Sequence, residues 1–438
     1  MLAVLGTLAL TSGSFSAVAV PPLAPPAEIP GLVSTHDESS EEVSISPIAV
    51  ESLGVLDLPS RPADPIMDAR VEARPALMPS SEESGAGSGA SAGSGIEGPD
   101  PIPAGPGVGI WIGSQALAQR PMSGAAWNSL VAAAEGATPN GANLSDQDSN
   151  HDVATLAAAL VAARTGVAKD RQRAIAALEG AIGTEQGARW LAIGRNLGAY
   201  VIAADVLDIR SGPVHDWLRG FLTKRLAHNN DGGSIMLRES AWSSGSNASA
   251  QEGFVHAALA AYFGDSGELA WAWNGFRRYA GDRTSPHRMS SNSSYWQADP
   301  SDPVGIQNRG ATKDGCRLDG AISNDMSRGG EDACVPGYTQ YPWVGLNGAV
   351  PAAVILARAG YPAWTVGDAA LFRAADYLAW LPTVTANPEW YDDGRAAQLK
   401  HLLNVAYDLQ APLHLPTGVG QTVGFTDWTH PDRASVGR

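Results

Sequence analysis

Arg328, Tyr338 and Tyr341 follow one another in the polar segment Asp314–Trp343, and their side chains could transfer a proton. A guanidinium placed beside a phenol stabilises the phenolate and so prepares the tyrosine to act as a base. The same residue types would equally suit a surface arginine followed by two packing tyrosines. The segment therefore indicates either a proton-transfer site or an ordinary surface loop.

Asn247 lies just before an expected helix start. Ser249 and Glu252 have the spacing of a capping box, and an apolar stripe begins at Val255. Unpaired backbone amides at a helix amino terminus favour a carboxylate or phosphate ligand. The alternative is that Asn247 only caps or turns the chain.

The segment Asp146–Asp152 begins like a calcium-binding loop. It has His151 where such loops need a glycine and Ala157 where they need a glutamate. We therefore exclude calcium here and expect His151 and Asp152 to cap the helix that follows. His151 remains a candidate cleft residue.

The chain contains only two cysteines, Cys316 and Cys334, and they bracket Arg328. Two cysteines exclude a disulfide-rich scaffold and a cysteine-based zinc site. In an exported protein the two would form a disulfide, worth about 3 kcal/mol in the chain-entropy model.

Helical periodicity dominates the chain from Trp111 onward, and convincing strands are absent. The segment 281–342 is long, polar and without a clear period, and a loop of that length in a compact domain is usually functional. We expect an all-α fold, an α/α toroid in which helical hairpins circle a central cleft; a bundle or solenoid is the plainer alternative. The expected helices lie near 124–135, 153–165, 168–182, 190–207, 213–227, 249–264, 267–279, 351–360, 367–381 and 397–409.

The first hundred residues differ from the rest of the chain. They carry a net charge of −11 out of −16 for the whole chain and contain no tryptophan or tyrosine. We expect a signal peptide at 1–20, ending near Ala19, a disordered linker rich in Pro, Ser, Gly and acid at 21–105, and a catalytic domain at 106–438. The protein would then be secreted or periplasmic. Its acidic balance argues against a nucleic-acid partner, and no apolar run is long enough for stable membrane insertion.

The sequence over roughly 110–435 resembles the alginate lyase family of helical-toroid polysaccharide lyases. The likeness is strongest in "DGAISNDMSRGG…GYTQYPWVGLNGAVPAAVILARAGY" (Asp319–Tyr361), which is similar to the family's run of an Arg-Gly followed by a tyrosine and a helix. Arg328 falls on the family's catalytic arginine. Tyr338 falls best on its catalytic tyrosine, with Tyr341 as the alternative because an insertion containing Cys334 shifts the alignment.

The resemblance also places Asn247 on the asparagine that binds the substrate carboxylate. A histidine follows that asparagine in the alginate-cleaving members, whereas Ala248 follows it here. The implied activity is β-elimination on a uronate-containing polysaccharide, which requires no metal and no cofactor. If tyrosine is not the base, the histidines to consider are His151, His228 and His256.

The implied partner is an anionic polysaccharide, whether alginate, a glucuronan or another uronate glycan, and no oligomeric state is predicted. Aromatic faces can carry sugar rings, so Trp242, Trp296 and Trp343 are candidate substrate-binding residues. Positive charge for the polyanion would come from the cleft cations Arg238, Arg309, Lys313, Arg317 and Arg328.

Two other functions fit the same pattern. A glycoside hydrolase on an α/α toroid would need a pair of carboxylates, and a non-catalytic glycan-binding protein would bind the polymer without turnover. The candidate carboxylates are Asp299, Asp319, Asp325, Glu331 and Asp332.

Overall fold

The computed structural model describes residues 109–228, 233–331, 334–390, 399–407 and 419–431. The expected signal peptide at 1–20 and linker at 21–105 lie outside these ranges. In the described part of the chain, no helix is both long and apolar enough to span a membrane.

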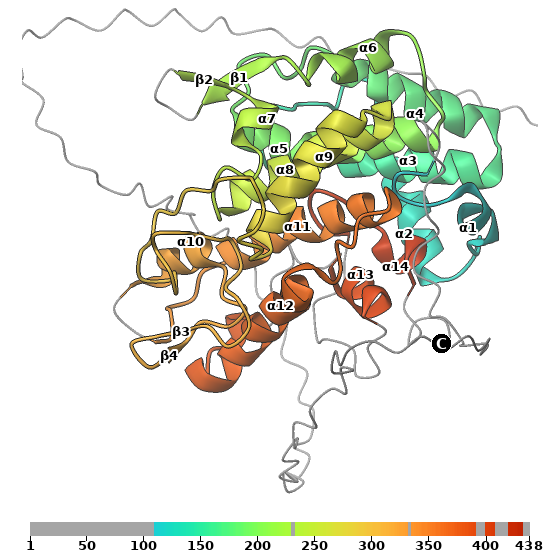
Figure 1. The fold of residues 1–438 in the computed structure, drawn as a ribbon. Coiled ribbons are helices and arrows are strands. Elements are labelled where there is room, and N and C mark those ends of the chain that lie inside the picture. The colour runs from blue at the N-terminus through green and yellow to red at the C-terminus, as the bar shows by residue number, and fades with distance from the viewer. Residues whose placement is uncertain (1–108, 229–232, 332–333, 391–398, 408–418, 432–438) are drawn as a thin grey trace, which may run out of the picture. The chain divides into compact units, whose positions relative to one another are not determined.

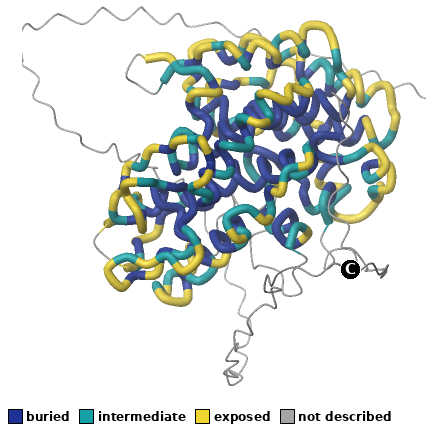
Figure 2. Tube along the Cα trace, viewed as in Figure 1, coloured by how far each residue is buried: buried dark blue, intermediate teal, exposed yellow. Residues whose placement is uncertain are grey.

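The described residues are mostly helical, as predicted (Figure 1). Buried residues lie in the interior, where the helices pack against one another, and exposed residues lie on the outside (Figure 2). The helices are α1 (Ser114–Gln119), α2 (Ala125–Ala134), α3 (His151–Thr165), α4 (Ala168–Ala181), α5 (Trp190–Val206), α6 (Pro213–Gly220), α7 (Leu237–Ser240), α8 (Asn247–Phe263), α9 (Ser266–Tyr279), α10 (Ser323–Met326), the 3-10 turn η1 (Ser327–Gly329), α11 (Tyr341–Arg358), α12 (Val366–Thr385), η2 (Pro388–Trp390), α13 (Leu399–Ala406) and α14 (Thr426–Thr429).

Helices α8 and α11 pack side by side and run in the same direction. The Cβ position of Gly345 on α11 lies 3.7 Å from the Cα atom of Asn247 on α8, and that of Gly348 lies 2.4 Å from the backbone of Ala250. Both helices therefore advance together along the contact. A side chain at Gly348 would collide with the α8 backbone, so this glycine sets the close approach.

Helix α5 lies on the other side of α8 and is parallel to it. The Cβ position of Gly194 meets the Glu252 side chain, and that of Gly198, one turn later, meets the ring of Phe254. The amino-terminal ends of α5, α8 and α11 therefore lie at the same end of a three-helix row. This end carries the partial positive charge of helix amino termini.

Two short antiparallel hairpins correct the expectation that strands are absent. Strand β1 (Arg225–His228) pairs with β2 (Gly233–Met236), and β3 (Thr312–Lys313) pairs with β4 (Cys316–Arg317). The strands are too short to show an alternating pattern. The β3–β4 turn did carry a sequence signal, the dipeptide Asp314-Gly315. Both residues have positive φ, which a two-residue hairpin turn of this kind requires.

Two helix boundaries also differ from the prediction. The helix expected near 351–360 begins at Tyr341, and Pro351 lies inside it. Proline usually begins a helix rather than continuing one, so the sequence pattern gave a late start. The helix expected at 213–227 ends at Gly220, and the chain then enters β1.

The predicted disulfide is confirmed: Cys316 and Cys334 are bonded, with their Cα atoms 4.9 Å apart. The bond joins β4 to the segment that follows η1. It therefore closes a loop that contains α10, η1 and Arg328.

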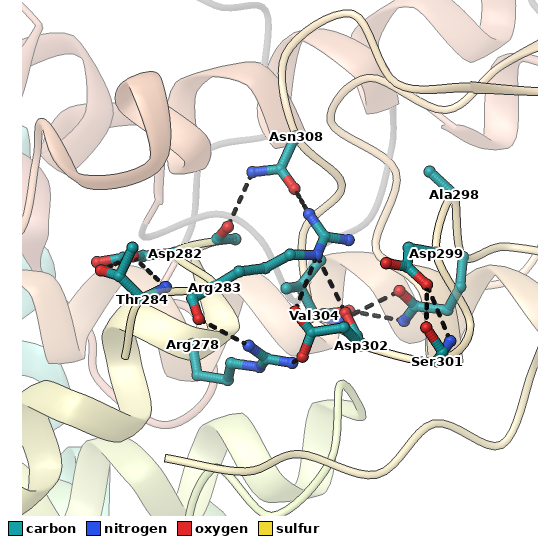
Figure 3. A network of polar contacts seen from close by, with 12 residues as sticks. Arg278, Asp282, Arg283, Thr284, Ala298, Asp299, Ser301, Asp302, Val304 and Asn308 are labelled. Atoms are coloured by element: carbon teal, nitrogen blue, oxygen red, sulfur yellow. Dashed lines mark hydrogen bonds and ion pairs between the residues drawn. The ribbon is translucent and has the colours of Figure 1, made fainter. Parts of the chain in front are cut away.

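A polar network holds the segment after α9 against the end of that helix (Figure 3). The buried Arg278 side chain forms an ion pair with Asp302. Arg283 donates to the backbone carbonyl of Asp302 at 3.1 Å and to the side chain of Asn308. Asn308 in turn donates to the carbonyl of Gly281 at 2.8 Å. The first part of the expected functional loop, 281–308, is thus held in place by this network before the chain enters α10.

Candidate functional site

Asn247 is the first residue of α8 and not a residue that precedes it. Ser246 is the cap, and its hydroxyl accepts a hydrogen bond from the backbone N–H of Ser249. The Ser249 hydroxyl donates to the carbonyl of Ser240 at 2.9 Å instead of capping the helix. Asn247 is only 8% exposed, so it lies in the interior and not on a surface loop.

Asp325 on α10 holds Asn247 through two hydrogen bonds. The backbone N–H and the Nδ2 amide of Asn247 both donate to Oδ1 of Asp325, each at 3.0 Å. Because both donors share one acceptor, the amide nitrogen of Asn247 faces Asp325. One Nδ2–H is used in this contact, and the second remains for another acceptor.

Burial dominates the electrostatics of Asp325. It raises the pKa of this carboxyl to about 7, while the hydrogen bonds from Asn247 and the positive charge of Arg328 lower that pKa by less. Burial, and then the charge of Asp325, also raise the pKa of the Tyr279 hydroxyl. At pH 7, Asp325 therefore exchanges between its neutral and ionised forms.

Gly345 shapes the space beside Asp325. Its Cβ position lies 2.7 Å from Oδ2 of Asp325 and 3.2 Å from the hydroxyl oxygen of Tyr279. Neither of these two buried oxygens has a hydrogen-bond partner among the described residues. Sequence reasoning missed Tyr279 and Gly345 and considered Asp325 only as a hydrolase carboxylate. The nearest available signal was the position of Asp325 three residues before Arg328.

Arg328 lies over the ring of Tyr341, with its guanidinium carbon 5.2 Å from the ring centroid. Tyr341 begins α11, and Gly345 follows one turn later on the same face of the helix. Arg328 and Tyr341 are thereby placed next to the contact between Asp325 and Asn247. Arg328 is exposed, and no carboxylate in the described ranges lies within ion-pair distance of it.

Tyr338 has a different environment from Tyr341. Its ring is 37% exposed and contacts the ring of Trp390 edge-on, with centroids 5.3 Å apart. The backbone N–H of Gly337 donates to the carbonyl of Gly329 at 2.7 Å, which keeps this segment beside η1. Both tyrosines are therefore near Arg328, but the guanidinium lies over the ring of Tyr341.

The other expected cleft cations already have partners. Arg238 pairs with Glu268 at 2.7 Å, Arg317 with Asp376 at 3.2 Å and Arg309 with Asp368 at 3.9 Å, and Lys313 donates to the carbonyl of Ser294. Of the five expected cations, Arg328 is thus the one whose charge is not met by an oxygen in the described structure.

The three tryptophans predicted to carry sugar rings lie in the core, which corrects that prediction. Trp242 and Trp296 are fully buried, and Trp343 is 1% exposed. The indole of Trp296 donates to the carbonyl of Gly330 at 2.9 Å and that of Trp343 to the carbonyl of Trp390 at 3.1 Å. These two rings support the backbone around Arg328 and Tyr338 rather than presenting a face to a ligand.

His151 belongs to a separate part of the structure. It is the first residue of α3, and its ring is held by the Tyr200 hydroxyl at 2.7 Å and the carbonyl of Thr138 at 2.6 Å. The carbonyl can only accept, so Nε2 carries the proton and Nδ1 accepts from Tyr200. Burial lowers the pKa of His151, with the Thr138 contact opposing it. These contacts fix a neutral structural histidine.

The two other histidines considered as bases also have contacts of their own. His256 pairs with Glu268 at 2.8 Å, and His228 stacks on Trp190. Within the described ranges, no three His, Cys, Asp or Glu side chains are grouped so that they could hold a metal ion.

Comparison with known proteins adds no assignment. No protein-family model, no curated protein and no solved structure matches this chain.

Proposed function

We propose that the protein is a polysaccharide lyase that cleaves a uronate-containing polysaccharide by β-elimination. The observation that carries the proposal is the position of Arg328: exposed, without a carboxylate partner among the described residues, and stacked on Tyr341 beside Asn247. These are the three residue types that the reaction needs.

The reaction removes the C5 proton of a uronate, which lies next to the sugar carboxylate. Arg328 and the remaining N–H of Asn247 would bind that carboxylate and stabilise the enolate-like charge that develops on it. The phenol oxygen of Tyr341 would take the C5 proton and return it to O4. The C4–O4 bond breaks, and its electron pair leaves with O4 as C4 and C5 form a double bond.

The local charge of the site is positive, unlike the net charge of the whole chain, and it suits an acidic sugar. The chain has a net charge of −16, so an acidic polymer needs a local positive site to approach. Arg328 supplies one charge, and the amino-terminal ends of α8 and α11 at Asn247 and Tyr341 add the partial positive charge of two helix termini.

The proposal extends to fold and location. The parallel row of α5, α8 and α11 would form part of the inner wall of an α/α toroid, with the site at the amino-terminal ends of the inner helices. The Cys316–Cys334 bond supports export, because disulfides persist in oxidising compartments.

Paired tyrosine variants test the proposal. Tyr341→Phe removes only the hydroxyl and should abolish the rise in near-ultraviolet absorbance that unsaturated products give with uronate polymers. Tyr338→Phe is the matched control and should keep most of the activity, because its ring lies against Trp390. If Tyr338→Phe is inactive and Tyr341→Phe is active, the base is Tyr338 instead of Tyr341. Two active variants would exclude tyrosine as the base.

A further inference from the structure

Asp325 lies behind the proposed carboxylate site and not in it. It is 1% exposed, whereas Asn247 keeps 8% of its surface accessible. The two residues are 78 positions apart in the chain, yet both Asn247 donors reach one oxygen of Asp325. We infer that Asp325 is a positioning residue that acts as a neutral acid, holding the Asn247 amide so that its second N–H faces the ligand carboxylate. This inference rests on the proposed function.

The shared acceptor explains why the amide has one orientation. If the Asn247 side chain turned over, its carbonyl oxygen would face Oδ1 of Asp325, and two acceptors would meet. With the proton of Asp325 on Oδ2, Oδ1 can only accept, so the flipped amide is excluded. The side-chain carbonyl oxygen of Asn247 therefore does not face the ligand carboxylate, which it would repel.

The unpartnered oxygens show where the proton of a neutral Asp325 would sit. Oδ1 is occupied by the two donors of Asn247, so the proton belongs on Oδ2. Oδ2 and the Tyr279 hydroxyl oxygen both face the Cβ position of Gly345, and neither has a partner among the described residues. Oδ2 is therefore the oxygen of Asp325 that is free to carry a proton.

The surrounding charges agree with a neutral acid in the bound state. The groups that face Asp325 are Asn247 on α8, Tyr279 on α9 and Arg328 on η1, while α11 contributes Gly345, which has no charge. Arg328 is the only cation among them. A ligand carboxylate on Arg328 would offset the charge that favours ionised Asp325, so binding should draw a proton onto Asp325.

The first experiment compares kcat/KM against pH for the wild type, Asp325→Asn and Asp325→Ala. Asp325→Asn keeps an acceptor for Asn247 but does not titrate, so it should retain activity within about tenfold near pH 6. The ratio of wild-type to Asp325→Asn activity should fall about tenfold per pH unit above about pH 7, because other titrating groups cancel in the ratio. Asp325→Ala should lose about a hundredfold in kcat/KM. A pH-independent ratio, or full activity in Asp325→Ala, would overturn the inference.

Asp314→Asn is the control on the same segment, because Asp314 is exposed in the turn between β3 and β4 and asparagine tolerates its positive φ. It should leave the wild-type pH profile unchanged. If Asp325→Ala does not fold, the Asp325→Asn ratio alone decides the outcome.

A binding measurement separates this inference from the proposed function. Calorimetric titration with a uronate oligosaccharide at pH 7, in buffers of different ionisation enthalpy, reports protons taken up on binding. The wild type should take up part of a proton, and Asp325→Asn should take up none. If only the wild type takes up protons and neither protein cleaves the polymer, the role of Asp325 is supported and the lyase activity is rejected. If the polymer is cleaved but both proteins take up equal numbers of protons, the lyase activity is supported and the role of Asp325 is rejected. A protein that neither binds nor cleaves the polymer would reject both proposals.

Discussion

Replacing Asp325 with asparagine should stabilise the folded protein at pH 8 relative to the wild type. The pKa of this carboxyl is about 7 in the folded protein and 3.8 in the reference state without burial. Below pH 3.8 both states are protonated, so burial has little electrostatic cost. As the pH rises from about 4 to 7 the unfolded chain releases this proton and the folded protein keeps it, which favours unfolding. At about 1.4 kcal/mol for each tenfold difference in proton affinity, the loss is about 4 kcal/mol by pH 8.

The asparagine variant removes this titration with little change in shape. Its carbonyl oxygen can accept both donors of Asn247. Urea unfolding followed by far-ultraviolet circular dichroism at pH 4 to 8 gives the free energy of unfolding of both proteins. The difference should grow by about 4 kcal/mol across this range. A constant difference between wild type and Asp325→Asn would refute the electrostatic account of Asp325.

Two further predictions concern stability. Changing Cys316 and Cys334 together to serine should lower the free energy of unfolding by about 3 kcal/mol, measured by urea unfolding without reductant. A wild-type protein that is equally stable with and without reductant would contradict this prediction. Gly348→Ala should cost about 1–3 kcal/mol, because the new methyl group would lie 2.4 Å from the backbone of Ala250. Gly220→Ala is its control, since nothing lies within 4 Å of that Cβ position, and equal unfolding midpoints in the two variants would show that the α8–α11 contact can relax.

The sequence predicted the elements whose signals are local. The apolar stripe from Trp190 located α5 within a residue of its observed end, and α4 was located equally well. The disulfide was predictable because the chain has only one possible pair. The predicted start of α11 was wrong because Pro351 lies inside the helix, where proline is locally disfavoured. Packing of α11 against α8 overrides this preference.

The candidate site was only partly predictable, because its decisive contacts join distant segments. Motif types singled out Asn247 and Arg328, but no local pattern connects Asn247 with Asp325 across 78 positions. The sequence also did not predict which tryptophan side chains are exposed. Trp242 is a plausible sugar platform by residue type, yet it lies in the core because Gly253 and Gly275 leave room for its indole between α8 and α9.

The fate of water during cleavage of a uronate polymer distinguishes a lyase from a hydrolase. The purified protein is incubated with alginate, a glucuronan and other uronate glycans in isotopically labelled water, and the products are read by ultraviolet absorbance and mass spectrometry. β-Elimination predicts unsaturated products that absorb in the near ultraviolet and contain no oxygen from the labelled water. Products that carry the label and do not absorb would identify a hydrolase and exclude β-elimination. Binding of the polymers without any product would exclude it as well.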